Sequence, residues 1–543
     1  MVENGATSSH VLVVGSGGAG VRAAIEAAEH GSVVLLSKTI AGKGGCTTMA
    51  EGGYNAVLRE DDDPSLHAAD TLKGGAYLND PALVEALVHE APDRVRELVA
   101  WGAVFDVAPG GGVAQRPFGG QQRPRTCYAG DRTGHEMMVT LMDRLAATDV
   151  EVVHECAAVE LLLDGDRCAG AAALDRDGDL SVFLADAVVL ATGGGTQVYD
   201  ISTNSSSGTG DGYALGFRAG AELIDMEMIQ FHPTGAIQPY DARGRLVTEA
   251  VRGEGGRLLN RLGERFMTRY DPERMELSTR DVVARAIATE ILEGRGTERG
   301  GVWLDVTHLP PGQVEERLPI MLEQFLAYGV DIRTEPMEVA PTAHHIMGGL
   351  RITPGCATTV PGLFAAGECS GGVHGANRLG GNALAETQVF GRRAGRSAGL
   401  EPERRREITP AIDRQLGTLR RRFDGFLDGD VPPHQIVKQL KLTMWRGAGI
   451  FRDREGLAGA FAGVEALRNA RLRAATARNL LECCTAENQC LLASLICRAA
   501  LLRPECRGAH TRRDPTCELP PDRSPYGHTF LSLTREGIEE VRA

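Results

Sequence analysis

The sequence contains no two cysteines separated by exactly two residues, although it has twelve cysteines in 543 residues. Zinc ribbons and ferredoxin-type iron–sulfur clusters need such closely spaced ligands, so neither is encoded here and we expect no metal site. An iron–sulfur centre that works with this chain would have to belong to another polypeptide. In a cytoplasmic protein the cysteines are expected to stay thiols.

Long apolar runs and targeting signals are also missing. No apolar stretch approaches the roughly 18 residues that span a bilayer, and the first ten residues, MVENGATSSH, lack the charged and apolar regions of a signal peptide. We therefore expect a cytoplasmic protein without direct membrane insertion. Basic residues are outnumbered by acidic ones, which gives a formal net charge of -14. This negative charge argues against binding to nucleic acid.

The N-terminal pattern is typical of a dinucleotide-binding unit. A short apolar strand, residues 11–14, runs into GSGGAG (residues 15–20), an alanine-rich helix and a second strand, residues 32–36. Glycines in such a turn let the backbone approach a pyrophosphate at the helix N-terminus. Ser37 and Lys38 stand where an NAD-binding protein usually has an acidic residue, which weakens an NAD interpretation more than an FAD one. The glycines assigned to cofactor contact are Gly15, Gly17, Gly18 and Gly20.

Three further glycine-rich segments are expected to close around the same cofactor. Residues 42–53 (GKGGCTTMAEGG) are small and polar, residues 187–194 form a buried strand that ends in Ala-Thr-Gly-Gly, and residues 363–384 read as a strand, a tight turn and a new helix. Asp211, in TGDG, suits a ribose hydroxyl or a helix N-cap, and the cap is favoured without other observations. The remaining predicted cofactor contacts are Gly45, Cys46, Thr47, Gly52, Gly53, Ala191, Thr192, Gly193, Gly367, Glu368, Ala383 and Leu384.

Histidine and arginine recur beside glycine or proline in a segment of different character, which we interpret as an inserted domain. The turn beyond this segment adds His374 and Arg378. One such residue is usually structural, but several together indicate a cationic pocket. Because a guanidinium suits carboxylates, we expect a cofactor and a carboxylate substrate to meet here. The motifs are QFHPTG (residues 230–235), TEAVRGEG (248–255), STRDVV (278–283) and PTAHHIMGG (341–349).

In this order, and over nearly the whole chain, these motifs resemble the flavoprotein subunits of succinate dehydrogenase and fumarate reductase, with L-aspartate oxidase as a cousin. Further matching motifs are AEGGYNAV, QRPFGG, DRTGH, HGANRLGGNAL, MWRGAGIFR and PECRGAH. The resemblance implies an α/β fold with a two-half Rossmann-like FAD-binding domain (residues 1–232 and 349–404). An inserted α+β capping domain (233–348) and a C-terminal helical domain (405–502) complete it. We expect the tail (503–543) to wrap over the surface.

The resemblance also implies which residues hold the substrate. His232, Thr248, His344 and Arg378 match the residues that bind the carboxylates of a C4 dicarboxylate. Phe118, beside two glycines in QRPFGG, is expected to line the pocket. The implied ligand is therefore fumarate or succinate.

Arg280 matches the catalytic proton donor of the family, and Glu249 and Arg252 match the relay that returns its proton. Reduction of fumarate needs a hydride at one alkene carbon and a proton at the other, and concentrated positive charge in a closed site polarises the double bond. His345, where relatives often have tyrosine, is expected to lie next to the flavin.

Cys46 occupies the position at which membrane-bound relatives carry a histidine that is covalently bound to the flavin. We predict noncovalent FAD, although a cysteinyl thioether is chemically possible. Without the covalent bond, fumarate reduction is the easier direction.

The segment GKGGCTTMAEGGYNA looks most like the archaeal thiol-dependent fumarate reductases, in which a separate iron–sulfur subunit takes electrons from coenzyme M and coenzyme B. The predicted partner is therefore an iron–sulfur electron-transfer protein of this kind. The alternatives are the flavoprotein of a succinate dehydrogenase and an L-aspartate oxidase, and QRPFGG and DRTGH fit the oxidase less well. From another class, an inactive FAD-binding electron-transfer or assembly module is disfavoured, because the expected catalytic residues are all present.

Overall fold

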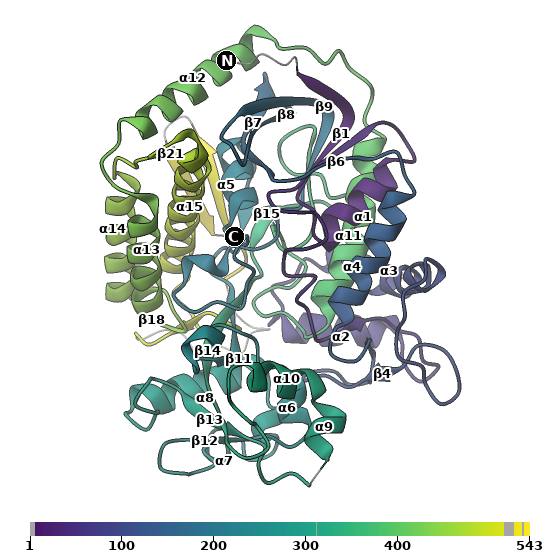
Figure 1. The fold of residues 1–543 in the computed structure, drawn as a ribbon, viewed down its shortest axis with the longest axis vertical. Helices are drawn as coiled ribbons and strands as arrows, with labels where there is room; N and C mark the ends of the chain where they lie inside the picture. Colours follow the sequence, from purple (N-terminus) through teal and green to yellow (C-terminus); the bar gives the residue numbers. More distant parts are fainter. Residues whose placement is uncertain (1–5, 311, 515–525, 535–536, 543) are drawn as a thin grey trace.

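The computed structural model describes residues 6–310, 312–514, 526–534 and 537–542. Figure 1 shows a larger part, built on a central sheet with helices on either side of it, and a smaller part at the bottom of the view. The chain enters the smaller part through β11 (Ile229–Ala236) and leaves it through β14 (Met337–Ile346). The smaller part is therefore an insertion, as the sequence predicts.

The central sheet brings three glycine-containing turns to one edge. Its strand order is β6-β2-β1-β9-β8-β7, and β16 also pairs with β9. Strands β1, β9 and β16 run parallel, so the turns that follow them, at Gly15, Ala191 and Gly367, lie at the same edge. The bounds are β1 (Thr7–Val14), β2 (Val33–Leu36), β6 (Glu151–Val153), β7 (Cys156–Asp164), β8 (Arg167–Asp175), β9 (Leu180–Leu190) and β16 (Leu363–Ala365).

Helices α1 and α11 cross at close range beside this sheet. A Cβ atom on Gly391 or Gly395 of α11 would overlap the backbone oxygens of Ala19 or Ala23 in α1. The close packing brings the N-termini of both helices to the edge where the glycine turns meet. Helices α3 and α4 lie on the outer side (Figure 1). The bounds are α1 (Gly18–Ala27), α2 (Pro64–Gly74), α3 (Pro81–Ala100), α4 (Thr133–Ala146) and α11 (Asn382–Gly399).

The inserted segment has its own sheet and its own hydrophobic core. Its strand order is β11-β14-β13-β12, antiparallel throughout. Val283, Val302 and Met337 belong to a buried cluster separate from that of the central sheet. The domain boundaries themselves stay predictions. The remaining bounds are β12 (Arg257–Leu259), β13 (Val302–Asp305), α6 (Glu249–Gly253), α7 (Met267–Tyr270), α8 (Arg280–Leu292), α9 (Gln313–Arg317) and α10 (Pro319–Ala327).

The prediction that the tail wraps over the surface is wrong for residues 503–512 and for the start of β20, which are largely buried, whereas the end of β20 and most of β21 are exposed. The Arg503 side chain is fully buried, and β20 pairs with β10 inside a second sheet of order β17-β15-β10-β20-β21. The start of the tail lies in the protein interior because the Arg503 guanidinium forms ion pairs with Glu227 and Glu505. The bounds are β10 (Leu223–Ile224), β15 (Gly349–Arg351), β17 (Ser370–Gly371), β20 (Thr529–Thr534) and β21 (Gly537–Arg542).

Four long helices form the C-terminal helical part. Cys483, Cys490 and Cys497 are buried on α15 and belong to the main hydrophobic core. Contrary to the expectation from apolar runs, residues 477–502 are long and apolar enough to cross a membrane by length and composition. Within this range, 78% of the most apolar 18-residue window is buried inside the protein, which is typical of a core helix. The bounds are α12 (Pro410–Leu427), α13 (Pro433–Gly447), α14 (Arg454–Arg468) and α15 (Leu480–Leu502).

Short elements complete the fold. Helix α5 begins directly after the TG of the TGDG motif, and β3, β5 and β4 form a small three-stranded sheet. Their bounds, with those of the remaining pair of strands, are α5 (Asp211–Arg218), β3 (Tyr54–Asn55), β4 (Gln115–Arg116), β5 (Thr126–Cys127), β18 (Phe451–Arg452) and β19 (Thr511–Arg512).

Candidate active site

A cavity of about 400 Å³ runs from the glycine turns of the central sheet to the inserted segment. Every predicted site residue lines this cavity except Gly20, Arg252 and His374. Residues that are far apart in the sequence therefore meet at one place, as the cofactor and substrate assignments require.

Glycine is required sterically at the first turn. Gly15 has φ +113°, and a Cβ atom there would overlap the carbonyl oxygen of Ala191. A Cβ atom on Gly20 would overlap the carbonyl oxygen of Gly15. Gly20 thus allows α1 to pack against the turn and does not face the cavity, which corrects its predicted role as a cofactor contact.

Two helix N-termini line the cavity without a capping side chain. Gly17 precedes α1 and Gly381 precedes α11, and neither position has a side chain that caps the helix. At α1 the Gly18 N–H donates to Thr47 Oγ1 over 3.2 Å, and the remaining N–H groups of both helices, with the helix dipoles, favour anionic oxygen. The two N-termini and the glycine turns therefore fit a dinucleotide that carries a pyrophosphate.

Lys38 and Asp211 bind one another at the dinucleotide end of the cavity. Lys38 Nζ lies 2.9 Å from Asp211 Oδ2 and 2.9 Å from Thr209 Oγ1. The N-cap of α5 is Gly210, so the capping role predicted for Asp211 is wrong. Burial alone would raise the pKa of Asp211, but Lys38 and the amide of Asn488 outweigh burial and lower it. Asp211 is therefore an ionised acid in the cavity wall.

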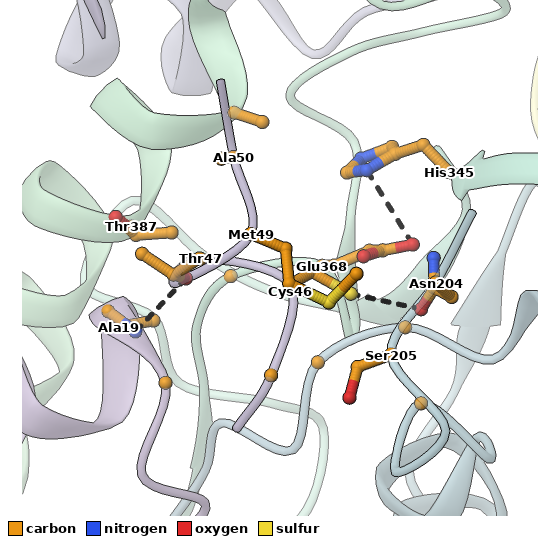
Figure 2. A pocket seen from close by; sticks show the side chains of 18 of the residues that line it. Ala19, Cys46, Thr47, Met49, Ala50, Asn204, Ser205, His345, Glu368 and Thr387 are labelled. Atoms are coloured by element: carbon orange, nitrogen blue, oxygen red, sulfur yellow. Dashed lines mark hydrogen bonds and ion pairs between the residues drawn. The ribbon is translucent and has the colours of Figure 1, made fainter. Parts of the chain in front are cut away.

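The Cys46 thiol points across the cavity toward Asn204, and Figure 2 shows the two side chains. Cys46 Sγ donates a hydrogen bond to Asn204 Oδ1 over 3.3 Å. Burial, together with the nearby carboxylate of Glu368, raises the pKa of the thiol to about 12. Cys46 is therefore a protonated thiol at neutral pH and a poor nucleophile.

Glu368 and His345 form a second buried pair, which Figure 2 also shows. His345 Nδ1 lies 3.5 Å from Glu368 Oε1, and the same oxygen accepts a hydrogen bond from the Ile346 N–H. Burial raises the pKa of Glu368 to about 7, and burial with the cation of Arg378 lowers the pKa of His345 well below its usual value. His345 is therefore neutral at pH 7.

His374, which lies in the glycine-rich turn, does not line the cavity. Its Nε2 lies 2.9 Å from Glu386 Oε2, and its ring stacks edge-to-face on His345 at 5.5 Å. Donor atoms of His345, His374 and Glu386 lie within 4.8 Å of one another, which is close enough for three metal ligands. The expectation of no metal site stays a prediction.

At the other end of the cavity, Glu249 lies between two arginines. Arg280 Nε donates a hydrogen bond to Glu249 Oε2 over 2.9 Å, and Arg252 Nη2 lies 3.9 Å from the same oxygen. Burial would raise the pKa of Glu249, but the two cations outweigh burial and hold it at about 2. Arg252 is completely buried behind Glu249 and bonds to the Glu276 carbonyl oxygen, so it contacts the relay and not the cavity.

The end of the cavity that contains Glu249 and Arg280 is also lined by the residues predicted to bind the substrate: His232, His344, Thr248, Arg378 and Phe118. The two imidazole rings lie 5.3 Å apart, and burial with neighbouring cations lowers the pKa of each well below its usual value. Arg378 Nη2 bonds to Gln230 Oε1 over 3.0 Å, whereas its Nε has no partner. Neutral histidines and arginine N–H groups are donors that suit two carboxylates.

Several lining residues were not predicted: Asn204, Ser205, Arg245, Gln324 and Glu386. A signal existed for the first two, because residues 202–209 (STNSSSGT) form a small polar loop soon after the Ala-Thr-Gly-Gly strand end. Arg245 and Gln324 lie outside any motif, and their place depends on how the inserted segment folds over the cavity.

Two families match the chain in consecutive regions. The FAD binding domain matches residues 10–384, and the fumarate reductase flavoprotein C-terminal domain matches residues 437–537. The first match spans both halves of the cavity and confirms FAD as the cofactor of this oxidoreductase.

Full-length relatives agree with this assignment. The chain is 51% identical over 517 residues to one of the subunits of the fumarate reductase (CoM/CoB) of Methanothermobacter marburgensis, and the match covers 93% of this chain and 94% of that protein. Identity to the fumarate reductase flavoprotein subunit of Mycobacterium tuberculosis is 40%, with 98% and 97% of the two chains covered.

A solved structure has the same fold. The FrdA chain of a mutated Escherichia coli quinol fumarate reductase superposes with a TM-score of 0.93 at 35% identity, covering 99% of this chain and 97% of that one. On the sequence matches and on this fold, the chain belongs to the family of fumarate reductase and succinate dehydrogenase flavoprotein subunits.

Proposed function

We propose that this chain reduces fumarate to succinate as the flavoprotein subunit of a fumarate reductase. The observation that carries the proposal is the Arg280–Glu249 contact in a cavity that also contains Arg378, His232 and His344. This arrangement offers donors for two carboxylates and a proton donor between them.

Binding and polarisation of the dianion come from the basic end of the cavity. Arg378, His344, His232 and Thr248 together bind the two carboxylates. FAD would be held by the glycine turns and the N-termini of α1 and α11, and when reduced it would supply the hydride for one alkene carbon. Because Arg378 and Arg280 are largely buried, their fixed positive charge stabilises the negative charge that develops on the substrate.

Arg280 donates the proton to the second alkene carbon. The pKa of a free arginine exceeds about 12, so this step needs the developing carbanion next to the guanidinium and a partner that restores the proton. Glu249 is that partner, because its 2.9 Å contact with Arg280 gives a direct path. Arg252 supports the relay from behind the cavity wall.

The proposed electron donor is an iron–sulfur partner subunit that takes electrons from coenzyme M and coenzyme B thiols. Support comes from the relative named for these two coenzymes at 51% identity over 93% of this chain. We also propose that FAD is held noncovalently, since the Cys46 thiol stays protonated, and that the complex is cytoplasmic.

A single-turnover experiment tests the proposal. FAD-loaded protein is reduced photochemically without oxygen and mixed with fumarate, and we expect reoxidation of the flavin with one succinate formed per FAD. Flavin that stays reduced contradicts the proposal. Reduction of oxidised FAD by L-aspartate would instead identify an L-aspartate oxidase, and faster dye reduction with succinate than fumarate turnover would identify a succinate dehydrogenase.

A further inference from the structure

Direct neighbours of the two pocket arginines contact each other where the inserted segment meets the rest of the chain. Asp281 follows Arg280 at the start of α8, and Asn377 precedes Arg378 in the turn after β17. Asn377 Nδ2 donates a hydrogen bond to Asp281 Oδ1 over 3.3 Å. Asn377 is 9% exposed and the Asp281 side chain 17%, so the contact is largely shielded from water.

Both ends of the Asn377 amide have a partner. Its Oδ1 accepts a hydrogen bond from Gln230 Nε2 over 2.8 Å. The same Gln230 side chain binds Arg378 twice, through the Arg378 carbonyl oxygen at 2.9 Å and through Nη2 at 3.0 Å. We call Gln230, Asn377 and Asp281 the polar bridge, since together they connect Arg378 to the residue beside Arg280.

Gly508 and Ala509 of the C-terminal segment contact the chain on both sides of the polar bridge. Arg285 forms an ion pair with Asp281 at 2.9 Å and donates to the Gly508 carbonyl oxygen at 3.3 Å. The next residue, Ala509, donates its N–H to the carbonyl oxygen of Ala376 at 2.9 Å. The PECRGAH motif contributes no residue to the cavity wall, yet it holds α8 and the Arg378 turn together.

Such a connection is needed because Arg280 and Arg378 repel each other. After burial, Arg280 is the largest cause of the lowered pKa of Arg378, which falls to about 9. Glu249 holds Arg280, but both residues belong to the inserted segment, so their contact does not set the separation between Arg280 and Arg378. The polar bridge spans the two parts of the chain.

We propose that the polar bridge fixes the separation of Arg280 and Arg378, so that Asn377 and Asp281 are positioning residues for proton transfer. The inference rests on the proposed function, in which Arg378 binds a carboxylate while Arg280 must reach an alkene carbon. A displacement on the order of 1 Å costs about 10²-fold in rate. Loss of the bridge should therefore lower kcat much more than carboxylate affinity.

The substitution Asn377→Asp tests this with little change of shape, because it places a second carboxylate against Asp281. With FAD-loaded protein and a reduced viologen dye as donor, we expect kcat for fumarate to fall about 10- to 100-fold. KM should change by less than about threefold, FAD content should stay normal, and the solvent isotope effect on kcat should rise, since proton transfer becomes slower.

Two further variants separate positioning from folding. The double variant Asn377→Asp/Asp281→Asn exchanges the donor and the acceptor of the hydrogen bond between residues 377 and 281. Its kcat should be about tenfold higher than that of Asn377→Asp alone. Asn469→Asp adds the same charge at the exposed end of α14 and should leave kcat unchanged. If Asn377→Asp does not fold, Asn377→Ala removes both hydrogen bonds without adding charge and is judged by the same criteria.

Three results would overturn the inference. A wild-type rate in Asn377→Asp, or a joint loss of kcat and thermal stability that the double variant does not recover, makes the bridge a structural contact only. A wild-type protein that binds FAD but leaves fumarate unreduced contradicts the proposed function and, with it, the role of the bridge. The first two results are obtained in an active wild-type background and so contradict the bridge alone.

Discussion

Arg280 Nε donates a hydrogen bond to Glu249 Oε2 over 2.9 Å, although the two residues begin different helices of the inserted segment. The contact joins a residue in the cavity wall to a carboxylate whose charge is maintained by two arginines. Proton return to Arg280 can therefore proceed through side chains that are already in contact.

Replacement of Arg280 by lysine should lower kcat for fumarate reduction by about 10²- to 10⁴-fold. A lysine ammonium is a compact point charge and cannot both contact Glu249 and reach the substrate as the planar guanidinium does. Activity with a reduced viologen donor measures the effect, and FAD absorbance per protein should be unchanged. Turnover close to that of wild type would exclude Arg280 as the proton donor.

Glu249→Gln keeps the shape of the side chain but removes its charge and its ability to pass a proton. We expect kcat to fall about 10²-fold or more, with binding of a nonreacting dicarboxylate changed little, because the variant removes a transition-state role. Flavin absorbance during titration with malonate measures the affinity. A large loss of malonate affinity at unchanged kcat would assign Glu249 to binding instead.

The pH dependence of kcat/KM should follow Arg378 at the alkaline end. Its pKa in the folded protein is lowered to about 9, so its charge is complete below pH 8 and is lost as the pH rises through 9. Since the cation binds a carboxylate, kcat/KM should fall about tenfold per pH unit above pH 9, whereas kcat should fall at higher pH because bound substrate stabilises the cation. A flat kcat/KM up to pH 10 would contradict this.

Substitution of Cys46 by serine should leave the attachment of FAD unchanged. The thiol has a pKa of about 12 and is protonated at neutral pH, so it is a weak nucleophile toward the flavin. Acid precipitation of wild type and variant should release all yellow colour into the supernatant. Colour in the wild-type pellet that is absent from the variant pellet would demonstrate a cysteinyl bond.

Much of the cofactor end could be predicted from sequence, because glycine is required there by backbone geometry. Gly15, Gly193 and Gly367 have positive φ angles and end buried strands, and both features are visible in the sequence as glycines after apolar runs. The basic end was found through short motifs that contain histidine or arginine, two of which place the basic residue directly before proline or glycine, at His232 and Arg252.

Other features could not be predicted because they depend on tertiary contacts. Lys38 and Asp211 pair across 173 residues, and no local pattern indicates that Asp211 binds this lysine and does not cap its helix. The burial of Arg503 could not be predicted either. A proline-rich tail is typical of a surface segment, and only the tertiary structure shows that Arg503 forms ion pairs with Glu227 and Glu505. The sequence assigned Arg252, with Glu249, to the proton relay. The position of Arg252 behind Glu249, however, follows only from the packing of α6.

A crystal structure of the FAD-loaded protein with a nonreacting dicarboxylate tests the central claim most directly. We predict that Arg378, His344, His232 and Thr248 hold the two carboxylates, and that the Arg280 guanidinium lies against the carbon that receives the proton, not the carbon that faces the flavin. A diacid bound elsewhere, or basic side chains that turn away from the flavin, would contradict the account.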